Sequence, residues 1–151
     1  MSDFLQPDVM EFDHINIMEI DPTIKPIDQG FYTLQVNKLT PKTVTPAKGK
    51  NQGKACLILS GSFTLVNDAN FAGRKFWKTF WTTNPVDLKD LRRLADATGV
   101  TQTPDQTLSD YANGFEVLDP PAELKIFIAE EADYRTQEPV NVLKFNQAQP
   151  V

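Results

Sequence analysis

Alternating apolar and polar positions predict a chain made mostly of β-strands. In residues 30–39, Tyr32, Leu34 and Val36 fall on one face, with threonine and amide side chains between them. A period of two is typical of a half-buried strand. Gly61, inside a second such segment, predicts a bulge or a sharp bend there. The remaining predicted strands cover residues 55–66, 74–83, 124–128 and 140–145, with a short one over residues 115–118 after the turn sequence Asn113-Gly114.

One segment between these strands has the pattern of an amphipathic helix. Thr83 or Asn84 can cap its first turn, Pro85 suits the first helical position, and Asp87 favours the positive end of the helix dipole. Gly99 is a natural helix stop. The apolar stripe at a spacing of 3.6 residues consists of Leu88, Leu91, Leu94 and Ala95.

The order of these elements predicts the fold class. About five strands, with one α-helix between the third and the fourth, is the order expected of an OB-type barrel. We therefore expect a mainly β protein, a small OB-like β-barrel, over residues 25–151. Residues 1–24 contain Pro7 and Pro22 and show no clear period. We expect them to form a separate, acidic N-terminal arm.

Composition places the chain in a broad class. Its 151 residues are 40% apolar and 23% charged, which is ordinary for one globular domain. Cys56 is the only cysteine, so an intramolecular disulfide is impossible and a reducing cytoplasm is favoured. No apolar run approaches the roughly 18 residues that span a bilayer, and no signal-peptide pattern is present. We expect a cytoplasmic protein with no membrane partner.

Charge is distributed unevenly, although the net charge is only −5. Residues 31–83 carry eight Lys and Arg against Asp68 alone, whereas residues 1–30 and 105–151 are both acidic. A polyanion responds to such a local field more than to the net charge. The alternative is that these lysines only solvate the long connection between the first two strands.

Both tryptophans lie in the third predicted strand, interleaved with cations. Alternation puts Trp77 and Trp81 on one face with Lys75, and Phe76 and Phe80 on the other with Lys78. We expect the Trp pair to form an exposed stacking platform for unpaired bases, with nearby cations contacting phosphates. The alternative is that the tryptophans are core and the phenylalanines are exposed, or that neither pair is exposed. The candidate nucleic-acid-binding residues are Lys38, Lys42, Lys48, Lys50, Lys54, Arg74, Lys75, Trp77, Lys78 and Trp81.

The residues that most enzymes need are scarce. His14 is the only histidine, so no Ser-His-Asp or Cys-His site can be assembled on the main body. Cys56 opens a strand and is better explained as a small buried hydrophobe. The acidic residues of segment 130–138 alternate between faces, which favours a solvated turn over a cation site. We expect no enzyme activity, no cofactor and no metal.

Short motifs along residues 25–146 resemble a known family. They are Ile27-Asp28-Gln29-Gly30-Phe31-Tyr32, Phe71-Ala72-Gly73-Arg74-Lys75-Phe76-Trp77, Asn84-Pro85 with the helix to Gly99, Gly114-Phe115-Glu116-Val117, and Asn141-Val142 with Lys144-Phe145. With these motifs the chain resembles a family of small phage proteins of unknown function, found among phage recombination and replication proteins. Members of that family are read as OB-fold, single-stranded-DNA-binding-like proteins.

The resemblance implies a function. It implies non-specific binding of single-stranded DNA in phage replication or recombination, in the host cytoplasm, with a phage recombinase or replication protein as a further partner. A homo-oligomer is compatible with it. The alternative function is a structural or protein-interaction module, such as a recombinase accessory or virion component, because Trp and Arg are also common hot spots of protein interfaces.

Overall fold

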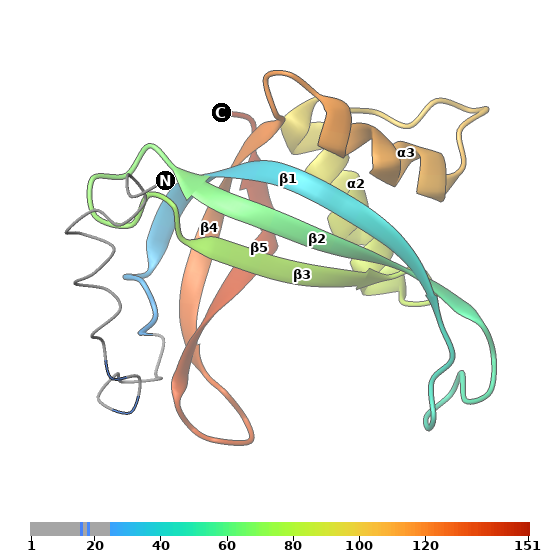
Figure 1. Ribbon diagram of the computed structural model, residues 1–151, viewed down its shortest axis with the longest axis horizontal. Helices are drawn as coiled ribbons and strands as arrows, with labels where there is room; N and C mark the ends of the chain where they lie inside the picture. The colour runs from blue at the N-terminus through green and yellow to red at the C-terminus, as the bar shows by residue number, and fades with distance from the viewer. Residues whose placement is uncertain (1–15, 17, 19–24) are drawn as a thin grey trace, which may run out of the picture.

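The protein is built on one strongly curved antiparallel sheet (Figure 1). The computed structural model describes Asn16, Met18 and residues 25–151. The mainly β class is confirmed, whereas the predicted arm lies outside the described residues, apart from Asn16 and Met18. Across the sheet the strand order is β3-β2-β1-β4-β5. The strands are β1 (Gly30–Val44), β2 (Cys56–Val66), β3 (Lys75–Trp81), β4 (Glu123–Ala132) and β5 (Pro139–Gln149).

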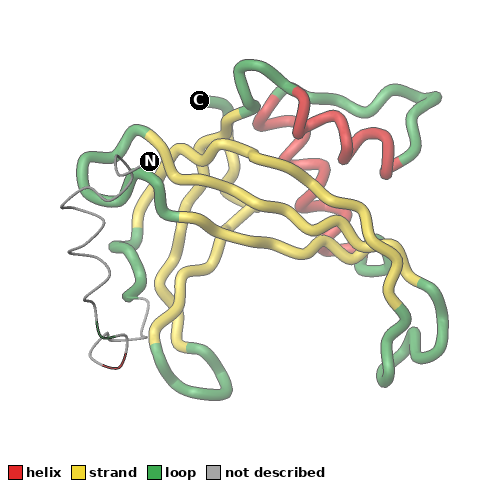
Figure 2. Tube along the Cα trace, viewed as in Figure 1, coloured by secondary structure: helices red, strands yellow, loops and turns green. Residues whose placement is uncertain are grey.

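Strand β1 joins the two halves of the sheet because it pairs with two neighbours. Its residues 30–35 pair with residues 123–128 of β4. Its residues 33–44 pair with residues 56–66 of β2, with an irregularity at Asn37. Figure 2 shows β1 arching across the molecule between these two neighbours. The two halves of the sheet therefore face each other across one core.

The irregularity lies in β1, so the prediction of a bulge at Gly61 is wrong. Gly61 has a different structural reason to be glycine. A Cβ at this position would lie 2.9 Å from the Phe63 ring and 3.1 Å from the Leu39 side chain. Contacts that short are not tolerated in a packed interior. Gly61 therefore permits close packing, and the extra residue of the bulge is Asn37.

The sheet is not closed by hydrogen bonds into a barrel. Strands β3 and β5 are its two ends. Across the gap, the ring centroids of Phe80 in β3 and Phe145 in β5 are 5.4 Å apart, and Phe63 of β2 lies 6.0 Å from Phe145. Side chains thus fill the space between the end strands. The largest buried core residues include Leu34, Phe63, Leu65, Phe80, Leu124, Ile126 and Phe145.

Between β3 and β4 the chain forms two α-helices and a short 3-10 helix. They are α2 (Pro85–Thr98), α3 (Leu108–Gly114) and η3 (Phe115–Val117), whereas the sequence predicted one helix. The short strand predicted for residues 115–118 is therefore wrong. Thr107 caps α3 by accepting a hydrogen bond from the Asp110 N–H. Tyr111 and Phe115, one helical turn apart, are buried with their rings 5.2 Å apart. This burial outweighs the turn propensity of Asn113-Gly114.

Helix α2 has the ends that the sequence predicts. The Asn84 side chain accepts a hydrogen bond from the Val86 N–H, and Gly99 ends the helix with a φ of 75°. The helix packs against β3, β4 and β5. Leu91, Leu94 and Ala97 are its buried apolar residues, whereas Leu88, expected on the buried stripe, is 40% exposed. In the described part of the chain, no helix has the length and apolar character needed to cross a membrane.

Candidate nucleic-acid interface

The two faces of β3 have different surroundings, and the tryptophans are on the outside. Phe80 is fully buried and Phe76 packs against the core. Trp77 has 68% of its surface exposed, and Trp81 is partly buried. Alternation along a strand explains this arrangement, because one face of β3 must cover the core. The tryptophan face is therefore available to a ligand.

Trp77 and Trp81 belong to a continuous surface across three strands, which we call the outer face. The register places Lys38 and Ser62 in line with Trp77, and Lys42 and Ile58 in line with Trp81. Neighbouring strands are about 4.8 Å apart, so Lys38 lies roughly 10 Å from Trp77 across β2. None of the outer-face residues is acidic. They are Gln35, Lys38, Thr40, Lys42, Ile58 (which is itself buried), Ser60, Ser62, Thr64, Lys75, Trp77, Thr79 and Trp81.

Short hydroxyl side chains occupy the middle of the outer face. Ser60, Ser62 and Thr64 alternate along β2 between the tryptophans and the β1 lysines. The Asn37 amide donates hydrogen bonds to the hydroxyls of Ser62 and Thr64, at 3.3 and 2.8 Å. These side chains are too short to cover the neighbouring Trp77 ring. The face thus offers an aromatic surface beside polar groups that can donate or accept hydrogen bonds.

Six of the lysines in residues 31–83 lie in two places. Lys38, Lys42 and Lys75 are exposed on the sheet, whereas Lys48, Lys50 and Lys54 are exposed in the loop between β1 and β2. Figure 1 shows this loop extending away from the body of the protein. Within the described residues, none of the six forms an ion pair with an Asp or Glu. Their charges are therefore available to an anionic ligand.

Two of the ten predicted residues have other partners. Lys78 points to the core side of β3, where its ammonium lies 3.3 Å from a carboxylate oxygen of Asp87. The Arg74 guanidinium donates a 2.7 Å hydrogen bond to the backbone carbonyl of Lys25. These two side chains support the fold beside the outer face. Asp87 neutralises the Lys78 charge, whereas the carbonyl that holds Arg74 is neutral, so Arg74 keeps its positive charge beside the outer face.

Asp87 has a role that the sequence did not reveal. It is only 7% exposed, and it is the buried charged residue of the described chain. In addition to its ion pair with Lys78, Asp87 accepts a 2.9 Å hydrogen bond from the Trp81 backbone N–H. This contact joins the start of α2 to the free edge of β3. The helix-capping pattern predicted an acid here, but nothing in the sequence indicated its contact with the edge of a strand.

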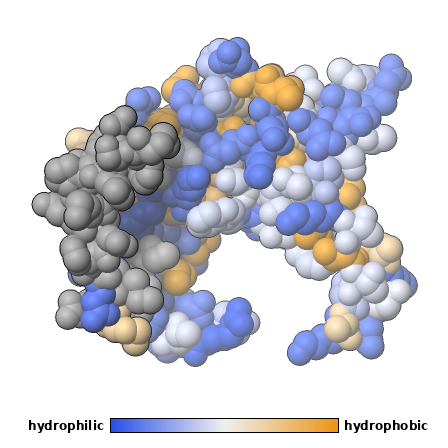
Figure 3. Space-filling model, viewed as in Figure 1, coloured by the Kyte–Doolittle hydropathy of each residue, from blue (hydrophilic) through white to orange (hydrophobic). Residues whose placement is uncertain are grey.

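The β4–β5 loop carries a second feature that the sequence analysis missed. Tyr134 is 81% exposed, and the Arg135 guanidinium lies 5.4 Å from the centre of its ring. Hydrogen bonds from the backbone N–H groups of Arg135 and Thr136 lower the pKa of Asp133 and shape the turn. The ends of the β1–β2 and β4–β5 hairpins point to the same side of the molecule, and Figure 3 shows a hollow between them.

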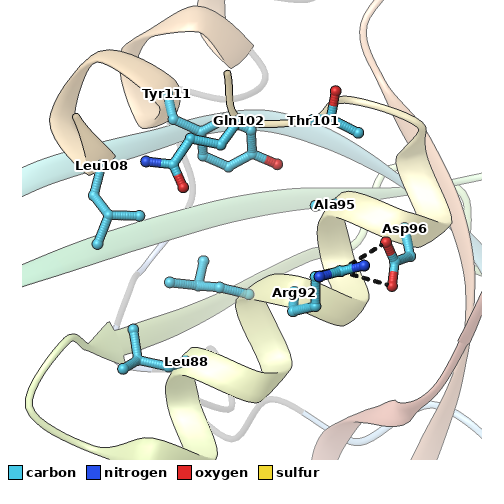
Figure 4. A pocket seen from close by; sticks show the side chains of 9 residues that line it. Leu88, Arg92, Ala95, Asp96, Thr101, Gln102, Leu108 and Tyr111 are labelled. Carbon is cyan, nitrogen blue, oxygen red and sulfur yellow. Dashed lines mark hydrogen bonds and ion pairs between the residues drawn. The ribbon is translucent and has the colours of Figure 1, made fainter. Parts of the chain in front are cut away.

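A pocket of about 570 Å³ lies between α2, α3 and the segment that joins them (Figure 4). Its apolar wall includes Leu88 and Leu108, and Arg92 pairs with Asp96 at 3.0 Å beside it. The Tyr111 hydroxyl donates a 2.6 Å hydrogen bond to the Val100 carbonyl, and burial raises the pKa of Tyr111 to about 12. Arg92 and Asp96 thus pair with each other, and the Tyr111 hydroxyl is held by a backbone carbonyl.

Groups that could hold a metal ion are absent from the described residues, where no three His, Cys, Asp or Glu side chains gather. Cys56 is buried. The outer face combines an exposed tryptophan with three exposed lysines on one sheet surface, so it is the best candidate for a binding site. No protein-family model matches the chain, and no curated protein sequence is significantly similar to it.

Proposed function

We propose that the protein binds single-stranded DNA without sequence preference, on the outer face of β1, β2 and β3. One observation carries the proposal: Trp77 leaves 68% of its surface exposed, beside Lys75 and in line with Lys38. Tryptophan is favoured inside proteins or at interfaces, and every nucleobase offers a π-face on which it can stack. Flanking lysines supply the charge that phosphates need.

The order of the elements supports an OB-like reading of the fold. Three strands, a helical segment and two strands follow one another, and β1 pairs with both β2 and β4. In OB-folds the second and third strands, with the loops between the first two and the last two strands, bind oligonucleotides. Here these elements carry Trp77, the loop lysines and Tyr134. We therefore place the bound strand over β2 and β3, between the two loops.

The proposed mechanism combines two terms. Lys38, Lys42 and Lys75, with the lysines of the β1–β2 loop, attract the phosphates and release condensed counterions. Three to six such contacts predict a slope of about −2 to −4 for log K against log salt. Stacking on the tryptophans adds about 1–3 kcal/mol per base. Neither interaction distinguishes one DNA sequence from another, because phosphates and base faces are common to all sequences.

Phage replication or recombination is the setting that we propose, because the motifs of residues 25–146 resemble phage proteins from those systems. A single-strand binder there would protect transient single strands in the host cytoplasm. A recombinase or a replication protein would then be its natural partner.

The test is a binding titration with fluorescently labelled oligo-dT, followed by anisotropy at about 50 and 200 mM salt. Lys38→Ala and Lys89→Ala form a matched pair, since both lysines are exposed but only Lys38 is on the outer face. We expect Lys38→Ala to weaken binding and reduce the salt slope by about 0.7, and Lys89→Ala to change neither. Equal effects of the two variants, or no binding of the wild type, would contradict the proposal. In the latter case a protein partner is the remaining candidate for this face.

A further inference from the structure

A second aromatic and cationic cluster lies on the sheet where β1 pairs with β4. Phe31 has 45% of its surface exposed, and its ring packs edge-to-face on Phe127, with the centroids 5.1 Å apart. The Lys125 ammonium lies 5.7 Å from the centre of the Phe31 ring. The cluster thus presents a fixed aromatic surface with a cation beside it, which is the combination found at Trp77.

This cluster is on the same side of the sheet as the tryptophans. Thr64 alternates with Ser62 along β2, and Ser62 is in line with Trp77, so both share the outer face. Gln35 is opposite Thr64, and Phe31 precedes Gln35 by four residues in the strand. An even number of residues along a strand returns to the same face. Phe31, Phe127 and Lys125 therefore continue the outer face onto β4.

The core gives no reason for these rings to be aromatic. The inward residues of the same two strands, such as Leu34 and Ile126, are completely buried. Phe31 and Phe127 are on the opposite side and, within the described residues, belong neither to the core cluster nor to the residues packed against it. An exposed Phe beside a lysine is better explained by a ligand than by folding.

Small side chains separate the two clusters. Thr33 and Gln35 of β1 and Thr64 of β2 lie between them on the outer face. Phe31 and Lys38 are seven residues apart in β1, which is about 23 Å at 3.3 Å per residue. At 3.4 Å per nucleotide, a stacked strand would cross this distance in about seven nucleotides, and a more extended strand in fewer. Charge favours a polyanion as the occupant, because Lys38, Lys75 and Lys125 are exposed along this path and outnumber Glu123, the partly buried acid opposite Gln35.

We propose that Phe31, held by Phe127 and flanked by Lys125, is a second base-stacking site, so that one strand of DNA runs from Trp77 across β2 and β1 to β4. This inference rests on the proposed single-stranded DNA binding. It adds the route of the DNA across the sheet and a dependence of affinity on oligonucleotide length. The affinity for oligo-dT rises steeply once the oligonucleotide is long enough to reach both clusters.

The test compares a thymidine trinucleotide, which is too short to reach both clusters, with oligo-dT of about twelve nucleotides. Phe31→Leu keeps an apolar side chain but cannot stack, whereas Phe31→Tyr keeps an aromatic ring. Val117→Ala, at an 80% exposed site on η3, is the control for a surface substitution. Far-UV circular dichroism shows whether each variant is folded.

We expect Phe31→Leu to weaken binding of the longer oligonucleotide about five- to 100-fold and to leave binding of the trinucleotide unchanged. Phe31→Tyr and Val117→Ala should both bind like the wild type. If Phe31→Leu binds the longer oligonucleotide like the wild type while Trp77→Ala does not, the second site is refuted and the proposed function stands. An equal loss of affinity for the trinucleotide and the longer oligonucleotide would also refute the second site, because the substitution would then act by disturbing the folded structure. A wild type that binds neither oligonucleotide would overturn the proposed function itself.

Discussion

The ring of Phe145 in β5 lies 5.4 Å from the ring of Phe80 in β3, at an interplanar angle of 69°, although these strands are opposite ends of the sheet. Both side chains are buried. Edge-to-face aromatic contacts therefore hold together the two ends that no hydrogen bonds join. The curvature of the sheet, and with it the shape of the outer face, depends on this packing.

Replacing Phe145 with alanine should strongly destabilise the protein. The substitution removes the ring that fills the space between β3 and β5, and a buried Phe→Ala change costs about 3–5 kcal/mol. Val140→Ala, at a 37% exposed position of the same strand, should change the free energy of unfolding by less than about 1 kcal/mol. Urea denaturation measures both. Similar losses in the two variants would mean that β5 does not close the core in this way.

Asp87→Ala should also destabilise the protein, by about 1–3 kcal/mol, because it leaves the Trp81 backbone N–H without its acceptor and removes the partner of Lys78. The control is Asp96→Ala, since the Asp96–Arg92 pair is exposed and should contribute less than about 1 kcal/mol. Asp87→Asn retains an acceptor and should be intermediate. A melting temperature for Asp87→Ala equal to that of Asp96→Ala would refute the anchoring role.

Trp77→Ala should weaken oligo-dT binding about five- to 100-fold, the equivalent of one lost stacking contact, with little change in stability because the ring is largely exposed. Trp81 is partly buried, and its backbone N–H donates a hydrogen bond to Asp87, so Trp81→Ala should reduce both binding and stability. Isothermal calorimetry and thermal melts separate the two effects. Variants that bind normally but unfold would show that the tryptophans are structural.

Removing residues 1–24 should tighten binding at low salt. This segment carries six acids and no Lys or Arg, and it joins the described chain at Lys25, whose carbonyl accepts the hydrogen bond from Arg74 just before β3. Negative charge attached beside the outer face opposes a polyanion there. A full-length variant with the six acids changed to their amides should behave like the deletion. Unchanged or weaker affinity in both would eliminate the idea.

Stability should fall between about pH 10 and pH 12 through Tyr111. Burial, with a contribution from the Asp96 charge, raises the pKa of Tyr111 from 10.0 to about 12 in the folded protein. The unfolded chain therefore loses this proton first, so the stabilisation is complete below pH 10 and disappears as the pH rises through 12. Tyr111→Phe should flatten this part of the profile, whereas Val117→Ala, at an exposed site without a titratable group, should not. Denaturation across this range of pH distinguishes them.

Short sequence patterns correctly predicted the features that depend on neighbouring residues in the chain. Alternation in β3 separated the buried Phe80 from the exposed Trp77, and capping residues located both ends of α2. Features set by distant contacts were not predictable. The pattern Asn113-Gly114 is typical of a hairpin turn, but burial of Tyr111 and Phe115 keeps that segment helical.

The candidate site likewise has features that the sequence predicted and features that depend on distant contacts. Exposed lysines could be identified by composition and alternation, whereas the partner of Lys78 could not, because Asp87 approaches it through the packing of α2 on β3. Phe31 was missed for a related reason. Its alternation with Tyr32 was visible, but its place beside Phe127 depends on the register of β1 with β4.

The central claim is that single-stranded DNA stacks on an exposed tryptophan, and intrinsic tryptophan fluorescence tests it most directly. Unlabelled oligo-dT would be titrated into the full-length protein at low and moderate salt. We predict saturable quenching that weakens as salt rises, because both tryptophans lie on the outer face with Lys38 and Lys75. Unchanged fluorescence at low salt, in a protein shown to be folded by circular dichroism, would contradict the account.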